Sequence, residues 1–431
     1  YRVQMLLDYH GAFDVSVYQE AWRLAIQTYP SLRLCFNWDE ALIQIITKTG
    51  CLNFKTHDIS ERPDKDKAVL DIQQEDREIA FDLSKPTLLR LHVIKHTETH
   101  HTLLKTEHHS ISDGWSGPIL LGQVHGYYES IISGNLPEII KDTAYIRAQA
   151  YTSTHQSDLT AYWEKQVASI HDRNDLNALL THPTNLDEVK ALESPQSKDI
   201  TIQSGVYQDL LQSEGLTINT LVQFAWHKLI QVYTGDTQTI VGTVISGRTL
   251  PIQGIESSVG PYINTLPLII NWKDVSIREQ LNYIQKQVSS LNEHGFASLA
   301  DLQTNGQRIF HSLLVFENYP SVSKGEHASL YIKLRGSIEK TDYPIGLMAY
   351  EVDNKLHLKL SYDEAHLSSD KAGQLLLQLE RIITQASKQI HSPTHHISLL
   401  STSEYQTIVY DWNQTEKAYP QDKTIHQMFS E

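Results

Sequence analysis

Two successive series of strand and helix patterns constrain the fold of this 431-residue chain more than any other feature of the sequence. The first series runs from a strand predicted at residues 1–8 to helices predicted at 143–170. The second begins with a strand near 199–203 and ends with a helix at 367–388. Residues 171–198, between the two series, are polar and lack clear periodicity, which is typical of a hinge or a crossover. The sequence therefore predicts an α/β (α+β mixed) fold with two lobes of comparable size.

Local signals define several elements of the first series. Asp14 is predicted to cap a helix that continues to Tyr29, because apolar residues follow it at helical spacing. Residues 32–38 and 41–48 are rich in β-branched and aromatic residues and indicate a hairpin. A second pair of strands is predicted at 88–96 and 101–108, and a helix follows from Asp113 to Ile132.

Composition excludes several classes of protein. Hydrophobic residues make up 40% of the chain and charged residues 20%, which is typical of a globular protein with sizeable cores. The net charge of −15 argues against nucleic acid as the main partner, because phosphate binding needs a basic surface. No apolar run is long enough for a membrane span. Cys35 and Cys51 are too few for a disulfide framework, so a cytoplasmic location is expected. The first residue is Tyr1 rather than Met, and we expect a piece of a larger protein.

The segment EHHSISDGWS, residues 107–116, carries the strongest chemical signal. Side chains alternate along a strand, so His108 and His109 should lie on opposite faces and only one can face a cleft. Asp113 follows at the turn, and Gly114 permits backbone geometry that a Cβ would forbid. A histidine held by a turn and a carboxylate suits proton transfer near pH 7. The alternative is that both histidines are ordinary packed or surface side chains.

The spacing His-His-x-x-x-Asp-Gly resembles the signature of CoA- or carrier-dependent acyltransferases with chloramphenicol acetyltransferase-like lobes. Within that superfamily, HHxxxDGWS most resembles the condensation domains of non-ribosomal peptide synthetases. Further segments similar to that family are YPSLRLCF (29–36), GTVISGR (242–248), SSVGPYINTLP (257–267), FHSLLVFENYP (310–320), TDYPIGL (341–347) and the linker-like WNQTEKAYPQDKTIHQMF (412–429). The family's N-terminal SxAQxRLW segment is absent, so the first strand of the domain is expected to be missing.

The resemblance implies an architecture and a division of the chain. Two chloramphenicol acetyltransferase-like lobes should form a V with a tunnel between them. Residues 1–170 would form the N-terminal lobe, 171–400 the C-terminal lobe, and 401–431 a linker toward an adenylation domain.

The resemblance also implies residue roles. His109 takes the central catalytic position, where it either deprotonates the attacking amine or orients it and stabilises developing charge. Gly114 is a second catalytic candidate, whose N–H could meet the developing oxyanion; plain turn geometry is the alternative. His108 is expected to pack or hydrogen-bond behind the site. Asp113 is expected to form a buried ion pair with Arg33, because such an aspartate in this family faces away from the cleft.

The remaining candidates belong to the motif or to the expected tunnel. Trp115 and Ser116 complete the motif, and Ser116 need not be a nucleophile because direct aminolysis of a thioester requires no acyl-enzyme. The residues expected to line the acceptor side, the tunnel floor between the lobes and a pocket are, in turn, Ser246, Gly247 and Arg248; Asn264 and Thr265; and Asn318 and Tyr343.

A metal site is the alternative interpretation of the six histidines between His92 and His109. The spacing of His92, His96 and His100 would suit one helix face, but this segment has the pattern of a strand. The sequence contains neither HExxH nor CxxC. No metal site is therefore predicted.

The function implied by the resemblance is peptide-bond formation by a condensation domain. Upstream and downstream peptidyl carrier proteins would bring the acyl or peptidyl donor and the aminoacyl acceptor on 4'-phosphopantetheine, and the domain itself would hold no cofactor. The donor is expected to be L-configured. Carrier docking would need a local patch, because the overall charge of the chain is negative. The alternatives are an epimerisation-type domain, a CoA-dependent acyltransferase of the same superfamily, and a catalytically silent domain that recruits carrier proteins.

Overall fold

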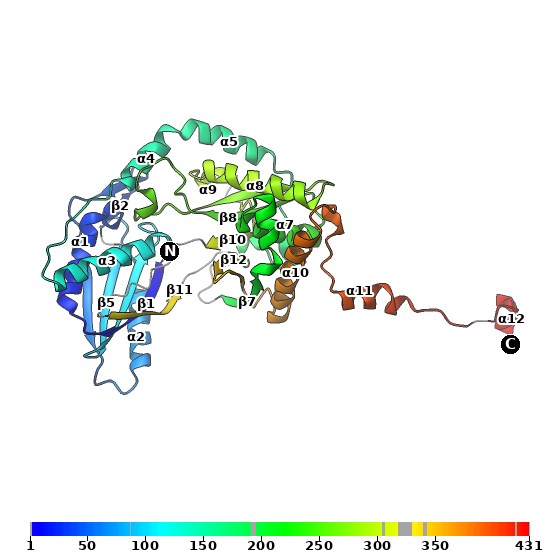
Figure 1. The fold of residues 1–431 in the computed structure, drawn as a ribbon, viewed down its shortest axis with the longest axis horizontal. Helices are drawn as coiled ribbons and strands as arrows, with labels where there is room; N and C mark the ends of the chain where they lie inside the picture. The colour runs from blue at the N-terminus through cyan, green and yellow to red at the C-terminus, as the bar shows by residue number, and fades with distance from the viewer. Residues whose placement is uncertain are drawn as a thin grey trace.

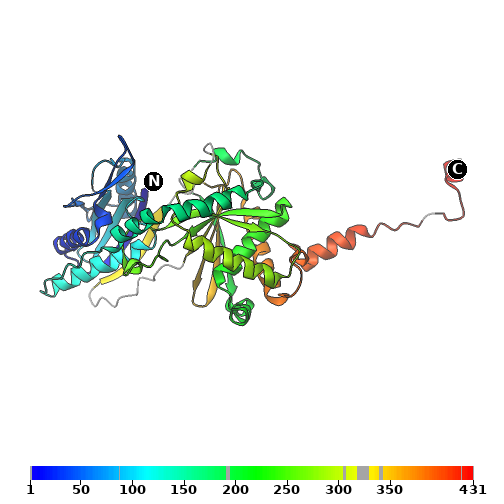
Figure 2. The same cartoon turned by 90° about the horizontal axis from the view of Figure 1, so that it is seen from above.

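The structure, a computed structural model, describes residues 2–86, 88–190, 195–303, 307–317, 330–338, 343–418 and 420–430. Two lobes lie side by side, each built on its own β-sheet, and the C-terminal segment extends away from the second lobe (Figures 1 and 2). Within the described parts of the chain, no helix has the length and apolar character needed to cross a membrane.

The first lobe contains a five-stranded sheet with the order β11-β1-β6-β5-β4. Its strands are β1 (Arg2–Gly11), β4 (Asn53–Asp58), β5 (Leu89–Thr97), β6 (His100–His108) and β11 (Leu330–Ile338). Strand β6 runs antiparallel to both β1 and β5, and β4 lies parallel to β5. Strand β6 is therefore the central strand of this sheet.

Helices cover both faces of the first sheet. On one face α1 (Val15–Thr28) and α3 (Ser116–Ile132) enclose the larger core, which contains Tyr9, Trp22 and Leu120. On the other face α2 (Lys65–Glu78) packs Val69 against a smaller apolar cluster that includes Leu104. The alternation of side chains along β1, β5 and β6 separates these two cores.

The second lobe contains a six-stranded sheet with the order β7-β13-β12-β10-β8-β9. Its strands are β7 (Gln196–Gln203), β8 (Gln238–Ile245), β9 (Asn264–Asn271), β10 (Ser312–Glu317), β12 (Ile345–Val352) and β13 (Lys355–Tyr362). The main core lies between this sheet and α7 (Ile218–Thr234), α8 (Ile277–Glu293) and α10 (Ser369–Lys388). Both lobes are thus sheets covered by helices.

Two helices connect the lobes along one side of the molecule (Figure 1). Helix α4 (Ala144–Thr154) packs Tyr145 into the core of the first lobe. Helix α5 (Gln156–Ala168) packs Trp163 into the core of the second lobe, where the indole N–H donates to the His294 carbonyl at 2.9 Å. A second connection is β11, which pairs antiparallel with β1 although the predicted division assigns its residues to the C-terminal lobe.

The remaining elements are short. The hairpin of β2 (Leu34–Asn37) and β3 (Ile43–Ile46) was predicted and is confirmed. Helix α1 is capped by the Asp14 carboxylate, which accepts from the N–H groups of Ser16 and Val17, as predicted. The other short elements are α6 (Gln208–Glu214), α9 (Leu299–Leu302), α11 (Thr402–Val409), α12 (Ile425–Ser430) and the 3-10 turns η1 (Pro30–Arg33), η2 (Leu176–Ala178), η3 (Leu186–Glu188), η4 (Ser204–Val206), η5 (Ile255–Ser257), η6 (Thr394–His396) and η7 (Asp411–Asn413).

Candidate functional site

The two histidines of the motif lie where strand β6 ends. His108 is its last residue, and its backbone N–H donates to the Leu88 carbonyl at 2.9 Å. His108 and His109 are both half-buried. The His108 Nδ1 lies 2.8 Å from the Ser110 hydroxyl, and burial lowers the pKa of His108 to about 4. His108 is therefore neutral near pH 7 and hydrogen-bonded within the turn.

Asp113 lies at the centre of a buried hydrogen-bond network at the start of α3. Its Oδ1 accepts from the backbone N–H and the hydroxyl of Ser116, at 2.8 and 2.7 Å. Its Oδ2 accepts from Arg248 at 2.9 Å and from the backbone N–H groups of Tyr262 and Ile263, at 2.9 and 3.0 Å. The side chains of Asp113 and Arg248 are 1% and 2% exposed. We refer to these five residues as the Asp113 network.

The Asp113 network corrects one prediction, since the partner of Asp113 is Arg248 and not Arg33. Arg33 lies in the turn η1, ahead of strand β2, and its guanidinium donates to the carbonyls of Thr47 and Lys48 at 3.1 and 3.0 Å. The expected ion pair between Asp113 and Arg33 is therefore wrong. The physical reason is that Asp113 faces the connection between strands β8 and β9, which leaves the sheet of the second lobe and packs into the core of the first.

Arg248 is held from several sides. It donates to the carbonyl oxygens of Ser246 at 3.3 Å and Ser258 at 3.2 Å. Its guanidinium also lies over the Tyr262 ring, with 4.4 Å to the ring centroid, and 5.5 Å from that of Trp115. Arg248 was expected to line the acceptor side of a tunnel, but its buried guanidinium joins the two lobes.

Gly247 makes this position of Arg248 possible. Its φ is +65°, in the left-handed region that favours glycine, and an added Cβ would overlap the Tyr262 carbonyl oxygen. Gly114, by contrast, is exposed and does not have a positive φ. Left-handed backbone geometry is therefore found at Gly247 and not at Gly114, and Gly247 is the glycine on which the Asp113 network depends.

Ser116 and Trp115 attach the start of α3 to the second lobe. The Ser116 hydroxyl oxygen lies 3.0 Å from both the N and the O of Gly260, besides its contact with Asp113. The Trp115 indole N–H donates to the Glu256 carbonyl at 3.1 Å. Ser116 is therefore fully engaged in hydrogen bonds, which agrees with the expectation that it is not a nucleophile.

The residues expected along the tunnel take part in other contacts. Asn264 and Thr265 begin strand β9, and the Asn264 amide donates to the carbonyls of Gly295 and Ala297 at 2.8 and 2.7 Å. Tyr343 stacks on Phe310, with ring centroids 5.4 Å apart. Asn318 lies outside the described residues. The tunnel itself stays a prediction.

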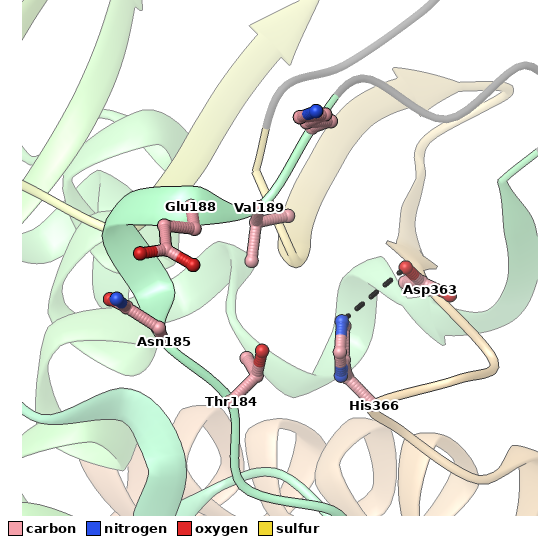
Figure 3. Close-up of a pocket in the computed structure, with 7 residues that line it drawn as sticks. Thr184, Asn185, Glu188, Val189, Asp363 and His366 are labelled. Atoms are coloured by element: carbon pink, nitrogen blue, oxygen red, sulfur yellow. Dashed lines mark ion pairs between the residues drawn. The ribbon is translucent and has the colours of Figure 1, made fainter.

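A pocket lies in the second lobe, between the segment around Asn185 and the turn that follows β13 (Figure 3). Its lining includes Glu188, Asp363 and His366, and the last two form an ion pair at 3.7 Å. Its lining residues include neither histidine of the motif. This pocket is therefore a different site from the Asp113 network.

Tyr262 is a site residue that the sequence did not single out. Its hydroxyl lies 2.6 Å from that of Ser258, which also contacts the Asp142 carboxylate. Burial raises the pKa of Tyr262. The sequence did contain a hint of this residue, because Tyr262 is the aromatic residue of the family-like segment SSVGPYINTLP. The resemblance of the segment as a whole assigned no role to that tyrosine.

Comparison with known proteins identifies the family to which this chain belongs. The family model of the condensation domain matches residues 1–409, so the chain belongs to the condensation-domain family. The predicted recognition, the mixed α/β fold class and the enzyme class, an amide-forming acyltransferase of non-ribosomal peptide synthetases, are thereby confirmed.

Two relatives in sequence are large synthases. The chain is 32% identical to N-(5-amino-5-carboxypentanoyl)-L-cysteinyl-D-valine synthase of Penicillium rubens over 451 aligned positions, which cover 100% of the chain and 12% of the synthase. It is 26% identical to tyrocidine synthase 3 of Brevibacillus parabrevis, and covers 7% of that protein. The chain thus spans only a small part of the relatives that it matches.

Solved structures share the fold. The X-domain from teicoplanin biosynthesis superposes with a TM-score of 0.76 at 18% identity, over 93% of each chain. The first condensation domain of the calcium-dependent antibiotic synthetase, in complex with a substrate analogue, gives a TM-score of 0.68 at 17% identity, over 93% of this chain and 94% of that one.

Proposed function

We propose that this condensation domain joins two carrier-bound substrates at His109. The amine of an aminoacyl thioester on a downstream carrier protein attacks the carbonyl carbon of an acyl or peptidyl thioester on an upstream carrier. The C–N bond forms, the C–S bond breaks, and the 4'-phosphopantetheine thiol of the upstream carrier leaves with a proton. The observation that carries this proposal is the turn between β6 and α3, which the buried Asp113–Arg248 pair anchors to the second lobe.

Both ends of that turn are anchored, which supports a positioning role for the segment. At its start the His108 N–H bonds to the Leu88 carbonyl, and at its end the Asp113 network fixes the first turn of α3. A side chain between two fixed elements loses little freedom when substrate binds. Positioning two tethered substrates can itself supply about 7–11 kcal/mol of the barrier reduction.

Histidine chemistry suits His109 for proton transfer from the amine. Asp113 cannot act as the carboxylate of a Ser-His-Asp arrangement, because both of its oxygens are used by Arg248, Ser116 and backbone N–H groups. We therefore assign Asp113 and Arg248 as positioning residues. His109 acts either as the base or as the group that orients the amine and stabilises developing charge, and Gly114 remains a candidate oxyanion donor.

The proposed partners are an upstream and a downstream peptidyl carrier protein and an adenylation domain. The adenylation domain is supported by the segment that includes α11 and α12. This segment extends away from the second lobe (Figure 2), and several of its apolar side chains are exposed. These include Tyr405, Trp412 and Phe429, of which Phe429 is 92% exposed. The domain holds no cofactor of its own in this proposal, since pantetheine arrives with the carriers, and its location is cytoplasmic.

A product assay with two loaded carriers tests the proposal. The wild-type chain should convert the donor and acceptor thioesters into a peptidyl thioester on the downstream carrier, read by mass spectrometry. His109→Ala should lose the activity, whereas His395→Ala, which changes an exposed histidine of the second lobe, should retain it. Binding of both carriers without product would instead identify a recruitment domain, and an epimerised but unextended thioester would identify an epimerisation-type domain.

A further inference from the structure

Three polar side chains gather on the α2 face of the first sheet, at the end opposite the catalytic motif. Asp8 and His100 lie on neighbouring strands β1 and β6, whose register pairs Asp8 with Thr102 and His10 with His100. His96 lies near the end of β5, where the register shifts between Lys95 and Thr97. At about 3.3 Å per residue, the nine residues of β6 separate His100 from His108 by about 26 Å. This cluster is therefore distinct from the catalytic motif.

The donor atoms of these three residues are close enough for one metal ion. One ligand atom from each of Asp8, His96 and His100 lies within 4.8 Å of the other two. The Asp8 Oδ1 and the His100 Nε2 are 3.5 Å apart. Zinc bonds of about 2.0–2.1 Å in a tetrahedron put two ligand atoms about 3.4 Å apart, so this pair already has the required separation.

The cluster is held by hydrogen bonds to Thr102, and two of its three side chains are partly exposed to solvent. The Thr102 hydroxyl donates to the Asp8 Oδ1 at 2.6 Å and lies 2.7 Å from the His96 Nε2, which orients both side chains. The His96 residue is 3% exposed, whereas the side chains of Asp8 and His100 are 14% and 27% exposed. The His100 Nε2 is buried without a hydrogen bond of normal geometry to any part of the chain that the structure describes. The His10 ring stacks on His100, with centroids 4.4 Å apart.

The side chains of the cluster are of the types that bind metal. An imidazole binds a metal ion through the lone pair of one ring nitrogen, and a carboxylate binds it through an oxygen.

Charged groups around the cluster balance one another. The Arg335 guanidinium lies 3.4 Å from the Asp8 Oδ1 and also contacts the Asp66 carboxylate. The Lys65 ammonium donates to the His96 carbonyl at 2.9 Å. Arg335 is thus a cation that competes with a metal ion for Asp8, and its second partner, Asp66, can hold it when it is displaced.

We propose that Asp8, His96 and His100 bind a Zn²⁺ ion, with a water molecule as the fourth ligand. Two imidazoles and one carboxylate form a donor set typical of zinc. The spacing of the histidines did not predict this site, because it would place metal ligands together only on a helix, whereas His96 and His100 lie on two strands. The structure brings His96 and His100 together across the turn of a hairpin and adds Asp8 from β1, which no local spacing reveals.

Calorimetric titration of the untagged chain with ZnCl₂, after removal of metal by a chelator, tests this proposal. The wild-type chain should bind one zinc ion, and Co²⁺ at the same site should give the visible absorption of tetrahedral cobalt. His100→Gln should abolish both signals, and Thr102→Val should weaken zinc binding by about 10–100-fold. The matched control is His357→Ala, which removes another strand histidine beside a threonine hydroxyl, at 3.0 Å from Thr201, and should bind zinc as the wild type does.

A variant that changes the charge beside Asp8 provides an independent test of the zinc site. Arg335→Gln should tighten zinc binding, because it removes the cation beside Asp8. Far-UV circular dichroism of each variant separates loss of the site from loss of the fold. The proposal is overturned if the wild-type chain binds no zinc, or if a folded His100→Gln variant binds zinc as tightly as the wild type.

Discussion

Strand β6 begins with one pair of adjacent histidines, His100 and His101, and ends beside another, His108 and His109. In the sequence the two pairs look alike. Asp8 lies 3.5 Å from His100, and Asp113 follows His109 by four residues in the sequence, but the two aspartates differ in what surrounds them. That difference separates the anchored segment of the proposed active site from the proposed metal site.

Asp113, near the end of β6, is almost fully buried and accepts hydrogen bonds on both oxygens from Arg248 and other donors. Asp8, near the start of β6, is 14% exposed, bonds to the Thr102 hydroxyl, and lies 3.4 Å from Arg335. A carboxylate saturated by an arginine and backbone N–H groups fixes the chain around it. A carboxylate that is partly exposed and has two imidazoles beside it can accept a metal ion.

The largest effect is expected when the Asp113–Arg248 pair is broken. Arg248→Met should lower the free energy of unfolding by about 3–5 kcal/mol, because it leaves a buried carboxylate without its cation. Urea unfolding followed by circular dichroism measures this change. Arg33→Met is the matched control, since Arg33 contacts only backbone carbonyls among the bonds that the structure gives it, and should cost much less. An equal loss in both variants would contradict the assignment of Arg248 as the partner.

A third aspartate, Asp76 of helix α2, is hydrogen-bonded to Arg90 of strand β5 and extends the comparison through its pH dependence. Burial raises the pKa of Asp76, but hydrogen bonds from His92, Arg90 and Thr106 outweigh this effect and hold the pKa well below its usual range. Asp76→Asn should therefore lower the free energy of unfolding by about 3 kcal/mol at pH 7. Because the folded-state pKa is depressed, the stabilisation is complete above about pH 4 and is lost as the pH falls further. Unfolding curves of both proteins at several pH values should converge in acid, and a constant difference would contradict the assignment.

Gly247→Ala should cost about 2 kcal/mol, because alanine disfavours the positive φ and its Cβ would overlap the Tyr262 carbonyl. Gly254→Ala is the control, since Gly254 has a similar φ of +84° but no atom within 4 Å of an added Cβ. It should cost about 1 kcal/mol. Thermal unfolding ranks the two variants, and the reverse order would show that contact with Tyr262 is unimportant.

Trp115→Phe should have the smallest effect. It removes the hydrogen bond from the indole to the Glu256 carbonyl and keeps an aromatic ring near Arg248. A loss of about 1 kcal/mol is expected in the same urea experiment. A loss as large as that of Arg248→Met would mean that Trp115, and not the ion pair, holds the two lobes together at this point.

Local patterns predicted much of the fold because they depend on neighbouring residues. The capped helix α1 and the hairpin of β2 and β3 are examples. The sequence did not predict β4 (Asn53–Asp58), because NFKTHD is largely polar and exposed, and only its pairing with β5 makes it a strand. The pairing of β11 with β1 joins residues more than 300 positions apart, so no local pattern could place it.

In the candidate site, too, features set by neighbouring residues could be predicted, and contacts between distant residues could not. The motif around His109 was recognisable because its residues are consecutive. The partner of Asp113 was not, because two arginines, Arg33 and Arg248, occurred in matching segments and only the three-dimensional arrangement selects between them. The cluster of Asp8, His96 and His100 required both a hairpin and a third strand, which explains why spacing alone missed it.

The rate of a single condensation turnover tests the central claim most directly. Wild-type and His109→Ala chains are mixed with saturating amounts of the two loaded carriers, and the peptidyl product is quantified after rapid quenching. The account predicts that His109→Ala binds both carriers normally and forms product about 10²–10⁴-fold more slowly, because proton transfer or orientation of the amine is lost. A His109→Ala chain that forms product at the wild-type rate would contradict it.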